Sequence, residues 1–199
     1  MVSKTPKPSG IALVIYKEIT DADRKKVRKK SNDSPTGGGA RDFRFSPYPS
    51  FKAVFEAMFP ARRKVSRKRG STKISIDVRV GEFSWTDPQT GNTASLEAIF
   101  ETPTDPRPNE GRVTKVPQYL PLQVLPPSNE RSVVIFVMHD DGSVWPEYVT
   151  VAALQSGAWH ASIAKPILAC LNAKRAANVD PRGYIDFRVT PTKLYCNGK

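Results

Sequence analysis

The sequence predicts an α+β domain that is mostly β, with a barrel-like or pseudobarrel architecture and a few short helices. Five segments have the apolar runs or the period-two alternation of strands, and the helix-like segments between them are few and short. Strands and helices do not alternate regularly, as they would in a doubly wound sheet. With 199 residues and 39% hydrophobic residues, the chain can bury a substantial core. We expect a flexible leader at 1–10, one domain over 11–190 and a C-terminal tail at 191–199.

The N-terminal half begins with a continuous apolar run at 11–16, which predicts a buried first strand. Residues 21–33 are rich in Lys and Arg and predict a solvated connection. Apolar side chains then recur at helical spacing over 50–59, which predicts a short amphipathic helix capped by Ser50 and stopped by Pro60.

Between 74 and 100 the pattern is that of two paired strands. Ile and Val alternate with polar residues over 74–80, which predicts a strand with one buried face. A strong turn signal at 87–92 separates it from a returning strand at 94–100. The proline-dense segment 102–130 predicts a long ordered loop with one edge strand at most.

The C-terminal part predicts a buried strand at 131–138, ended by an acidic turn. Pro146 is placed to open a helix that reaches Gln155, and a second helix is expected to start at Pro166. A last strand is expected at 183–189.

Net charge is the clearest functional signal, because a surplus of +12 indicates an anionic partner. Nucleic acid is the commonest partner of this kind; an anionic membrane or an acidic protein is less favoured. The charge is concentrated in two runs, at 24–30 and 62–73. A basic surface that is merely solvated remains an alternative.

The two cysteines, Cys170 and Cys196, make no disulfide framework. Cys170 lies in an apolar helical pattern, which is typical of a small buried hydrophobe. No secretory apolar segment occurs at the N-terminus. We therefore expect a soluble cytoplasmic protein, associated with the nucleoid if prokaryotic, without a membrane partner.

Catalytic signatures are absent from the sequence. Neither histidine, His139 or His160, belongs to a zinc-type pair, and the carboxylate-x-Lys motif of common nucleases occurs only inside the cationic segment 21–33. We therefore expect no enzyme activity, no metal and no cofactor. A small metal-dependent nuclease with an unfamiliar site is the alternative, and its candidate residues are His139, Asp140, Asp141 and Glu97. The first three are better explained by a strand-ending turn.

A third hypothesis is binding of single-stranded DNA or RNA. Aromatic side chains beside basic residues can stack on bases. The candidates are Phe43, Phe45, Tyr48 and Tyr119. Burial in the core is the better expectation for the two phenylalanines.

Four stretches, in order over 33–160, carry a family resemblance. They are Thr36-Gly37-Gly38 with a helix ending Met58-Phe59-Pro60, where the family has Leu-Phe-Pro; the alternating strand 74–80; Ala98-Ile99-Phe100 with Asn109-Glu110-Gly111-Arg112-Val113-Thr114; and the apolar strand 133–137 with an acidic segment and helix after it. The chain resembles the N-terminal effector-DNA-binding domain of EcoRII-type restriction endonucleases, related in fold to the plant B-three-type pseudobarrel.

The resemblance implies an open pseudobarrel that grips duplex DNA from the major-groove side with two arms, at 36–44 and about 107–115. Arginine can bond guanine O6 and N7, and glutamate can accept from cytosine N4, so the base-reading candidates are Arg41, Arg44, Glu110 and Arg112. The arm and backbone candidates are Thr36, Gly37, Gly38, Arg107, Asn109, Thr114 and Lys115. The candidates for contacts with phosphates are Arg62, Arg63, Lys64, Arg67, Lys68 and Arg69. An exposed Glu110–Arg112 ion pair of small energetic weight is the alternative.

Several positions depart from the family pattern. Gly39-Ala40 replaces His-Gln, Gly111 replaces a lysine, and Arg41 and Arg44 stand for valine and tyrosine. The family's nuclease domain has no counterpart here. The resemblance therefore implies a sequence-specific duplex DNA-binding domain from a restriction or other anti-invader defence system. Its nuclease or effector would be a separate subunit or a missing part of the protein, and the family's target sequence does not carry over.

Overall fold

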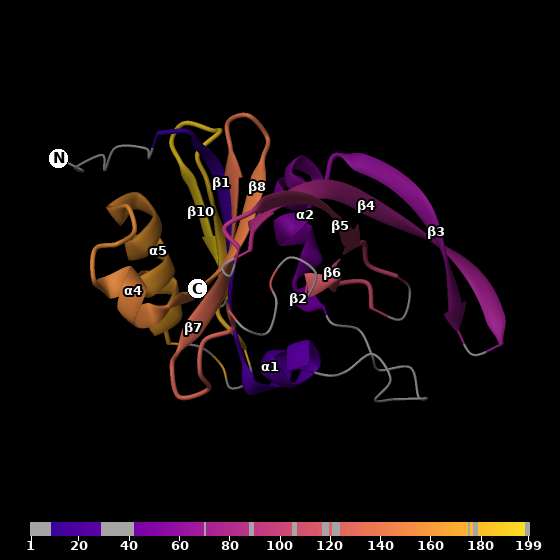
Figure 1. The fold of residues 1–199 in the computed structure, drawn as a ribbon, viewed down its shortest axis with the longest axis horizontal. Helices are drawn as coiled ribbons and strands as arrows, with labels where there is room; N and C mark the ends of the chain where they lie inside the picture. The colour runs from indigo at the N-terminus through magenta and orange to yellow at the C-terminus, as the bar shows by residue number, and fades with distance from the viewer. Residues whose placement is uncertain are drawn as a thin grey trace. The chain divides into compact units, whose positions relative to one another are not determined.

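The computed structural model separates into two compact units, formed by Met1–Ile19 with Leu125–Lys199 and by Thr20–Val124. Ten strands and four helices occur in the part of the chain that the structure describes, so the prediction of a mostly β α+β protein is confirmed (Figure 1). The described residues are 9–28, 42–69, 71–87, 90–104, 107–116, 120, 124–174, 176 and 179–197. Within them, no helix combines the length and the apolar character needed to cross a membrane.

The first unit is built on an antiparallel sheet in the order β10-β9-β1-β7-β8. Its strands are β1 (Ile11–Glu18), β7 (Ser132–His139), β8 (Val144–Thr150), β9 (Arg182–Asp186) and β10 (Lys193–Cys196). The predicted buried strands at 11–16 and 131–138 are confirmed as β1 and β7, whose inner residues are all buried. Continuous apolar runs of this kind are expected in strands that bury side chains on both faces of a sheet.

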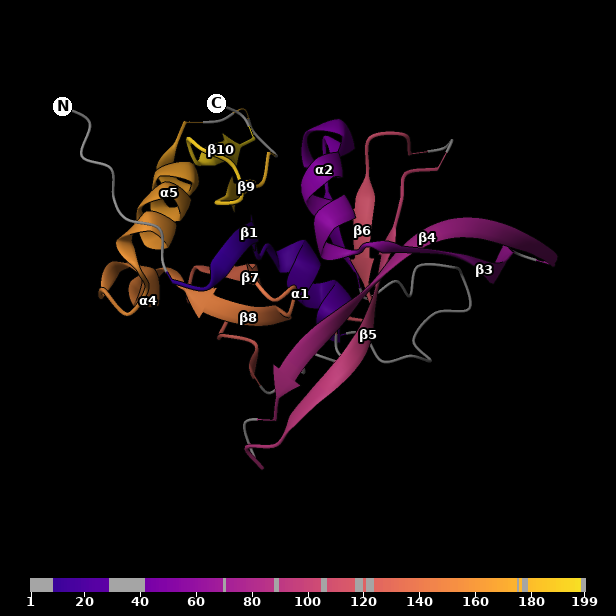
Figure 2. The same cartoon turned by 90° about the horizontal axis from the view of Figure 1, so that it is seen from above.

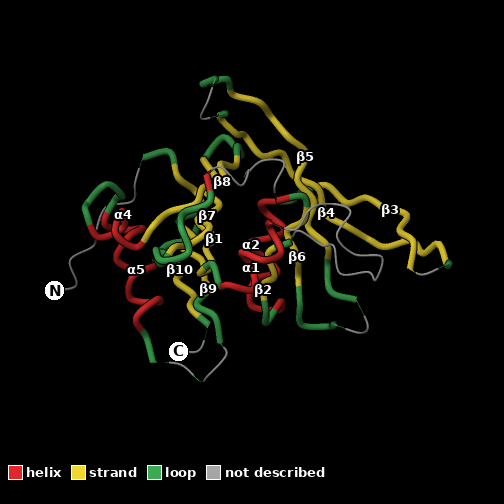
Figure 3. Tube along the Cα trace, turned by 60° about the horizontal axis from the view of Figure 1, so that its bottom comes forward, coloured by secondary structure: helices red, strands yellow, loops and turns green. Residues whose placement is uncertain are grey.

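Helices α4 (Val151–Gln155) and α5 (Ala161–Asn172) cover one side of this sheet (Figures 1 and 3). Ile163, Ile167 and Leu171 of α5 recur at helical spacing and pack into one core with Val14 of β1 and Ile135 of β7. The unit therefore has the simple order of a sheet with one helical layer.

Two helix starts were predicted wrongly. Pro146 lies inside strand β8, opposite Phe136 of β7, and α4 begins only at Val151, where the Thr150 hydroxyl accepts a bond from the Ala153 amide at 3.1 Å. Pro166 lies inside α5, which begins one turn earlier. A proline at the first position of a helix is a local preference, and pairing of β8 with β7 outweighs it.

The cysteines also depart from expectation. Cys170 is buried, as predicted, but it forms a disulfide with Cys196, so the two residues join α5 to β10. The segment expected to be a tail at 191–199 therefore holds a strand that is paired with β9 and covalently tied to a helix.

The second unit has an antiparallel sheet in the order β3-β4-β5-β6-β2 (Figure 1). Its strands are β2 (Phe43–Phe45), β3 (Ala61–Arg69), β4 (Thr72–Thr86), β5 (Thr93–Glu101) and β6 (Gly111–Thr114). The predicted strands at 74–80 and 94–100 are confirmed, and the Gly91 amide bonds the Asp87 carbonyl in the predicted turn. Strand β6 lies in the proline-dense segment but is not an edge, because β5 and β2 pair with its two sides.

Helix α2 (Tyr48–Met58) confirms the predicted amphipathic helix and supplies much of this unit's core. The rings of Phe55 and Phe100 stack with centroids 4.2 Å apart, and Phe45 meets Phe55 edge-on at 5.0 Å. Ser50 is not the cap: the helix begins at Tyr48 and its cap residue is Pro47, which makes no side-chain cap bond.

The segment predicted as a solvated connection begins instead with helix α1 (Asp21–Arg28). Thr20 and Asp23 cap it reciprocally: the Thr20 amide donates to the Asp23 carboxylate and the Asp23 amide donates to the Thr20 hydroxyl, both at 3.2 Å. Val27 is buried on its inner face. The capping pair and the buried Val27 thus stabilise a helix in a strongly charged segment.

Candidate nucleic-acid interface

The two segments proposed as DNA-binding arms adjoin at strands β2 and β6. Arg44 of β2 is the register partner of Arg112 of β6, and the Tyr48 amide donates to the Asn109 carbonyl at 2.9 Å. Residues directly opposite in an antiparallel pair project from the same face. The fold therefore brings together Arg44, Glu110 and Arg112, three of the four residues predicted to read bases.

Glu110 is the centre of this cluster. Its carboxylate accepts bonds from Arg44 Nη1 at 3.3 Å, Arg107 Nη1 at 3.2 Å and Arg112 Nε at 3.1 Å. The exposed fractions of these side chains run from 22% for Glu110 and Arg112 to 46% for Arg107. The cluster is thus half-buried, and each of these side chains keeps some exposed surface.

Two further carboxylates lie beside these residues, and neither is among the predicted site residues. Asp42 is fully buried, with Oδ1 3.4 Å from Arg44 Nε and Oδ2 3.9 Å from Arg112 Nη1. Glu101 Oε2 lies 3.9 Å from Arg112 Nη1. Burial raises the pKa of Asp42, and the positive charge of Arg44 opposes that rise. The sequence signal that indicates Asp42 is its alternation with Arg44 around the apolar Phe43, which places both charged side chains on one face of a strand.

We call Asp42, Arg44, Glu101, Arg107, Glu110 and Arg112 the β2–β6 charge cluster. It contains three guanidiniums and three carboxylates, so its formal charge is balanced when all are ionised. The Glu110–Arg112 ion pair is present, but it is half-buried and belongs to a larger network. Such a network holds planar guanidiniums in fixed orientations, which is what bidentate recognition requires.

Gly111 lies at a position where a side chain would collide with its neighbours. A Cβ on Gly111 would lie 2.4 Å from Phe100 Cζ and 3.0 Å from Tyr48 Cδ2. Phe100 is fully buried and stacked on Phe55, so its ring has no room to move. The glycine therefore lets β6 pass directly over an aromatic ring.

We expect Gly111→Ala to lower the free energy of unfolding by about 1–3 kcal/mol, because the added methyl group overpacks this contact. Chemical denaturation of both proteins measures the difference. Gly91→Ala is not a suitable control because Gly91 has φ +71°. Ser95→Ala, at an exposed residue of β5, is suitable and should change stability little. An unchanged midpoint for Gly111→Ala would mean that β6 does not pack on Phe100 as described.

Strand β3 carries the second set of predicted DNA contacts. Arg62 and Lys64 are exposed, the Arg62 side chain to 79%. Arg63 is engaged more closely: its guanidinium donates two bonds to Glu97, at 2.7 and 2.8 Å, whereas Arg62 Nη2 lies 3.9 Å from Glu56 Oε1. These bonds lower the pKa of Glu97. Arg67, Lys68 and Arg69 belong to β3 by backbone pairing, and their side chains lie outside the described residues.

The remaining arm candidates have different outcomes. Thr114 is buried and its hydroxyl donates to the Ile99 carbonyl at 3.3 Å, so its side chain is engaged inside the fold. Lys115 has φ 60° and its Nζ lies 3.6 Å from Glu97. Asn109 is exposed. Thr36, Gly37, Gly38 and Arg41 lie outside the described residues.

Residues behind the alternative functions are otherwise engaged. Phe43 and Phe45 have no exposed surface, which excludes them as stacking platforms, and Tyr48 stacks on Phe100 with centroids 5.8 Å apart. Tyr119 lies outside the described residues. The single-strand hypothesis thus keeps none of its aromatic candidates as a free surface among the described residues.

The acidic segment that follows β7 forms a turn, and its polar groups bond to nearby backbone groups. His139 Nδ1 lies 3.1 Å from the Gly10 carbonyl oxygen, and Asp141 Oδ1 accepts the Ser143 amide at 2.8 Å. Bonds from Ser143 lower the pKa of Asp141. Among the residues that the structure describes, no group of three or more His, Cys, Asp or Glu could hold a metal ion.

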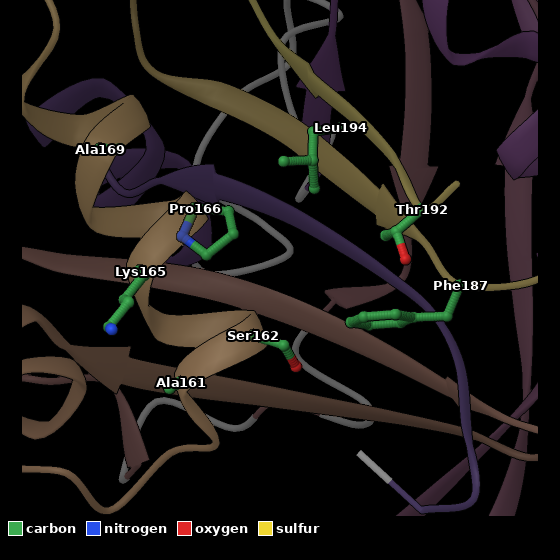
Figure 4. A pocket seen from close by; sticks show the side chains of 8 residues that line it. All are labelled: Ala161, Ser162, Lys165, Pro166, Ala169, Phe187, Thr192 and Leu194. Carbon is green, nitrogen blue, oxygen red and sulfur yellow. The ribbon is translucent and has the colours of Figure 1, made fainter. Parts of the chain in front are cut away.

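The first unit contains a hollow of about 360 Å³ between α5 and the β9–β10 strands (Figure 4). Phe187 and Leu194 form its apolar wall, and Ser162, Lys165 and Thr192 add the polar side chains. Its lining contains no Asp, Glu, His or Cys, so it has no acid–base pair.

No family model and no curated protein matches this chain. The resemblance to EcoRII-type effector domains therefore stays a prediction.

Proposed function

We propose that this chain is a sequence-specific double-stranded DNA-binding domain that contacts the major groove with two arms. The observation that carries the proposal is the β2–β6 charge cluster. Segments that are implied by resemblance to be separate arms pair in register, and three arginines converge there on one glutamate. Side chains of these types are those that read guanine and cytosine edges.

The β2–β6 charge cluster and strand β3 differ in net charge, and we infer from this difference that they have different roles in DNA binding. The cluster is balanced and attracts a polyanion weakly, whereas β3 presents exposed cations. Phosphate contacts supply affinity and register, and base contacts supply discrimination. We therefore assign affinity mainly to β3 and specificity mainly to the cluster.

On binding, a guanidinium of the cluster exchanges its bond to Glu110 for guanine O6 and N7, and Glu110 accepts from a cytosine amino group. Arg112 is the best placed for this, since Glu110, Asp42 and Glu101 surround it within 3.9 Å and fix its plane. Duplex DNA is favoured over single strands because the aromatic candidates Phe43 and Phe45 are buried.

The test is selection from a randomised duplex pool, with single-stranded DNA and RNA as competitors, at two salt concentrations. We expect enrichment of one short duplex motif that persists at the higher salt. Binding that disappears with salt and enriches nothing would remove the assigned role of the cluster. Metal-dependent cleavage of the pool would favour the nuclease alternative.

Replacing Arg112 with alanine should lower discrimination between the selected site and its single-base variants by about 1–3 kcal/mol. Competition binding with matched duplexes measures this difference. Lys52→Ala, an exposed change on helix α2, is the control and should leave discrimination unchanged. Equal weakening of Arg112→Ala on all duplexes would reassign Arg112 to phosphate contact.

The biological setting that we propose is restriction or another anti-invader defence, with a separate nuclease or effector subunit. This step follows from the family resemblance alone. Co-purification of the chain with a nuclease from its own cells would support it, and a defence phenotype that survives deletion of the gene would contradict it.

A further inference from the structure

Strand β4 is long enough to pair with different neighbours along its length. It pairs with β3 over its N-terminal nine residues and with β5 over its C-terminal nine, and only 78–80 pair with both. Residues 64–69 of β3 and 72–77 of β4 therefore form a two-stranded ribbon that runs away from β5 (Figure 2). Its six residue pairs span about 20 Å.

This segment, which we call the cationic ribbon, has one fully polar face. Lys64 stands opposite Asp77 and Ser66 opposite Ser75, and all four residues are exposed, as is Lys73. The two serine side chains at the middle of the polar face are short and project little from the strand backbone. The surface of a ligand can therefore approach the strand backbone closely at the middle of the polar face.

The other face differs. Val65, Ile74 and Ile76 occupy the alternate positions and are half-buried. The ribbon is thus amphipathic, and its polar face is the one that is available to a ligand.

The ribbon carries an excess of positive charge, which favours an anionic ligand. Residues 64–77 contain five Lys or Arg and a single acidic residue. The second two-stranded part of β4, formed by 81–86 with 93–98 of β5, is the reverse, with Glu82 and Glu97 and no Lys or Arg.

We propose that the cationic ribbon enters the major groove of duplex DNA with its polar face toward the base edges. A two-stranded ribbon fits this groove, which is about 12 Å wide and 8.5 Å deep. Ser66 and Ser75 then bond base edges at the centre, Asp77 accepts from a cytosine amino group, and Lys64 and Lys73 bond guanine or phosphate. This inference rests on the proposed function and adds a second reading element to the β2–β6 charge cluster.

The first test places negative charge on the face. Ser66→Glu/Ser75→Glu should weaken binding of the full chain to the selected duplex by about 10–100-fold. The matched control is Thr86→Glu/Thr93→Glu, two opposed and exposed residues of the acidic part of β4, with the same change in charge. The control should bind within about threefold of the wild type. Thermal unfolding of both variants checks that they are folded.

Guanine N7 methylation, which marks the major groove, gives a second readout. Methylated guanines should block the wild type at defined positions, and Ser75→Ala should relax base preference at one or two of them. Relaxation there, with non-specific affinity unchanged, supports groove entry even if the Glu variant folds poorly.

The outcomes separate the two proposals. Wild-type affinity in Ser66→Glu/Ser75→Glu, or equal losses in this variant and its control, would overturn the ribbon assignment and leave the DNA-binding function in place. The β3 cations would then serve to prevent edge-to-edge strand pairing. A wild type that binds no duplex would overturn the proposed function itself.

Discussion

Replacing Arg62 and Lys64 with alanine should weaken binding to every duplex by roughly 60-fold near 0.1 M salt. Each phosphate contact contributes about 0.9 to the slope of log affinity against log salt, so the loss of two should lower the slope by about 1.8. Both side chains are exposed, and they are two residues apart on β3, on the same face of the strand. Contacts of this kind release counterions without regard to sequence.

The measurement is a salt titration of binding to the selected duplex and to an unrelated one. Arg63→Ala is the matched control, because Arg63 has the same charge and strand but is bonded to Glu97. We expect a much smaller change in slope for it. An unchanged slope in the Arg62→Ala/Lys64→Ala variant would mean that this part of β3 faces away from DNA.

Removing the disulfide should have the largest effect on stability. The bond closes a loop across a sequence separation of 26 residues, and loop-closure entropy then predicts a loss of about 3–4 kcal/mol in Cys170→Ala/Cys196→Ala. Strand β10 should lose most, because it has four residues and pairs only with β9 among the described strands. Exposed Leu194 adds little burial to hold it.

Chemical denaturation compares the oxidised wild type with the alanine variant, and amide hydrogen exchange reports on β10. Wild-type protein kept reduced should match the variant, which controls for the loss of the two sulfur atoms. Equal stability of all three would show that β10 is held by its sheet pairing alone.

The disulfide also changes the argument about location. Cytoplasmic residence was expected partly because two cysteines make no framework, yet they are bonded with Cα atoms 5.7 Å apart. Stable disulfides are typical of oxidising compartments and rare in a reducing cytosol. The cysteine content therefore gives no support to a cytoplasmic location.

The sequence by itself determined the elements whose signal is local. Alternation over 74–80, the apolar runs in β1 and β7 and the helical spacing in α2 all identified their elements, because side-chain periodicity reports which face is buried. It also determined the net charge of +12, which depends on composition alone.

Only the tertiary structure decided which distant residues meet. Arg44 bonds Glu110 across 66 positions, Asp42 becomes a buried carboxyl group beside them, and Cys170 bonds Cys196. Strand β8 likewise overrides a helix signal at Pro146 because β7 lies beside it. Such choices depend on how the whole core packs, whereas a local pattern encodes only the backbone preference and the buried face of its own segment.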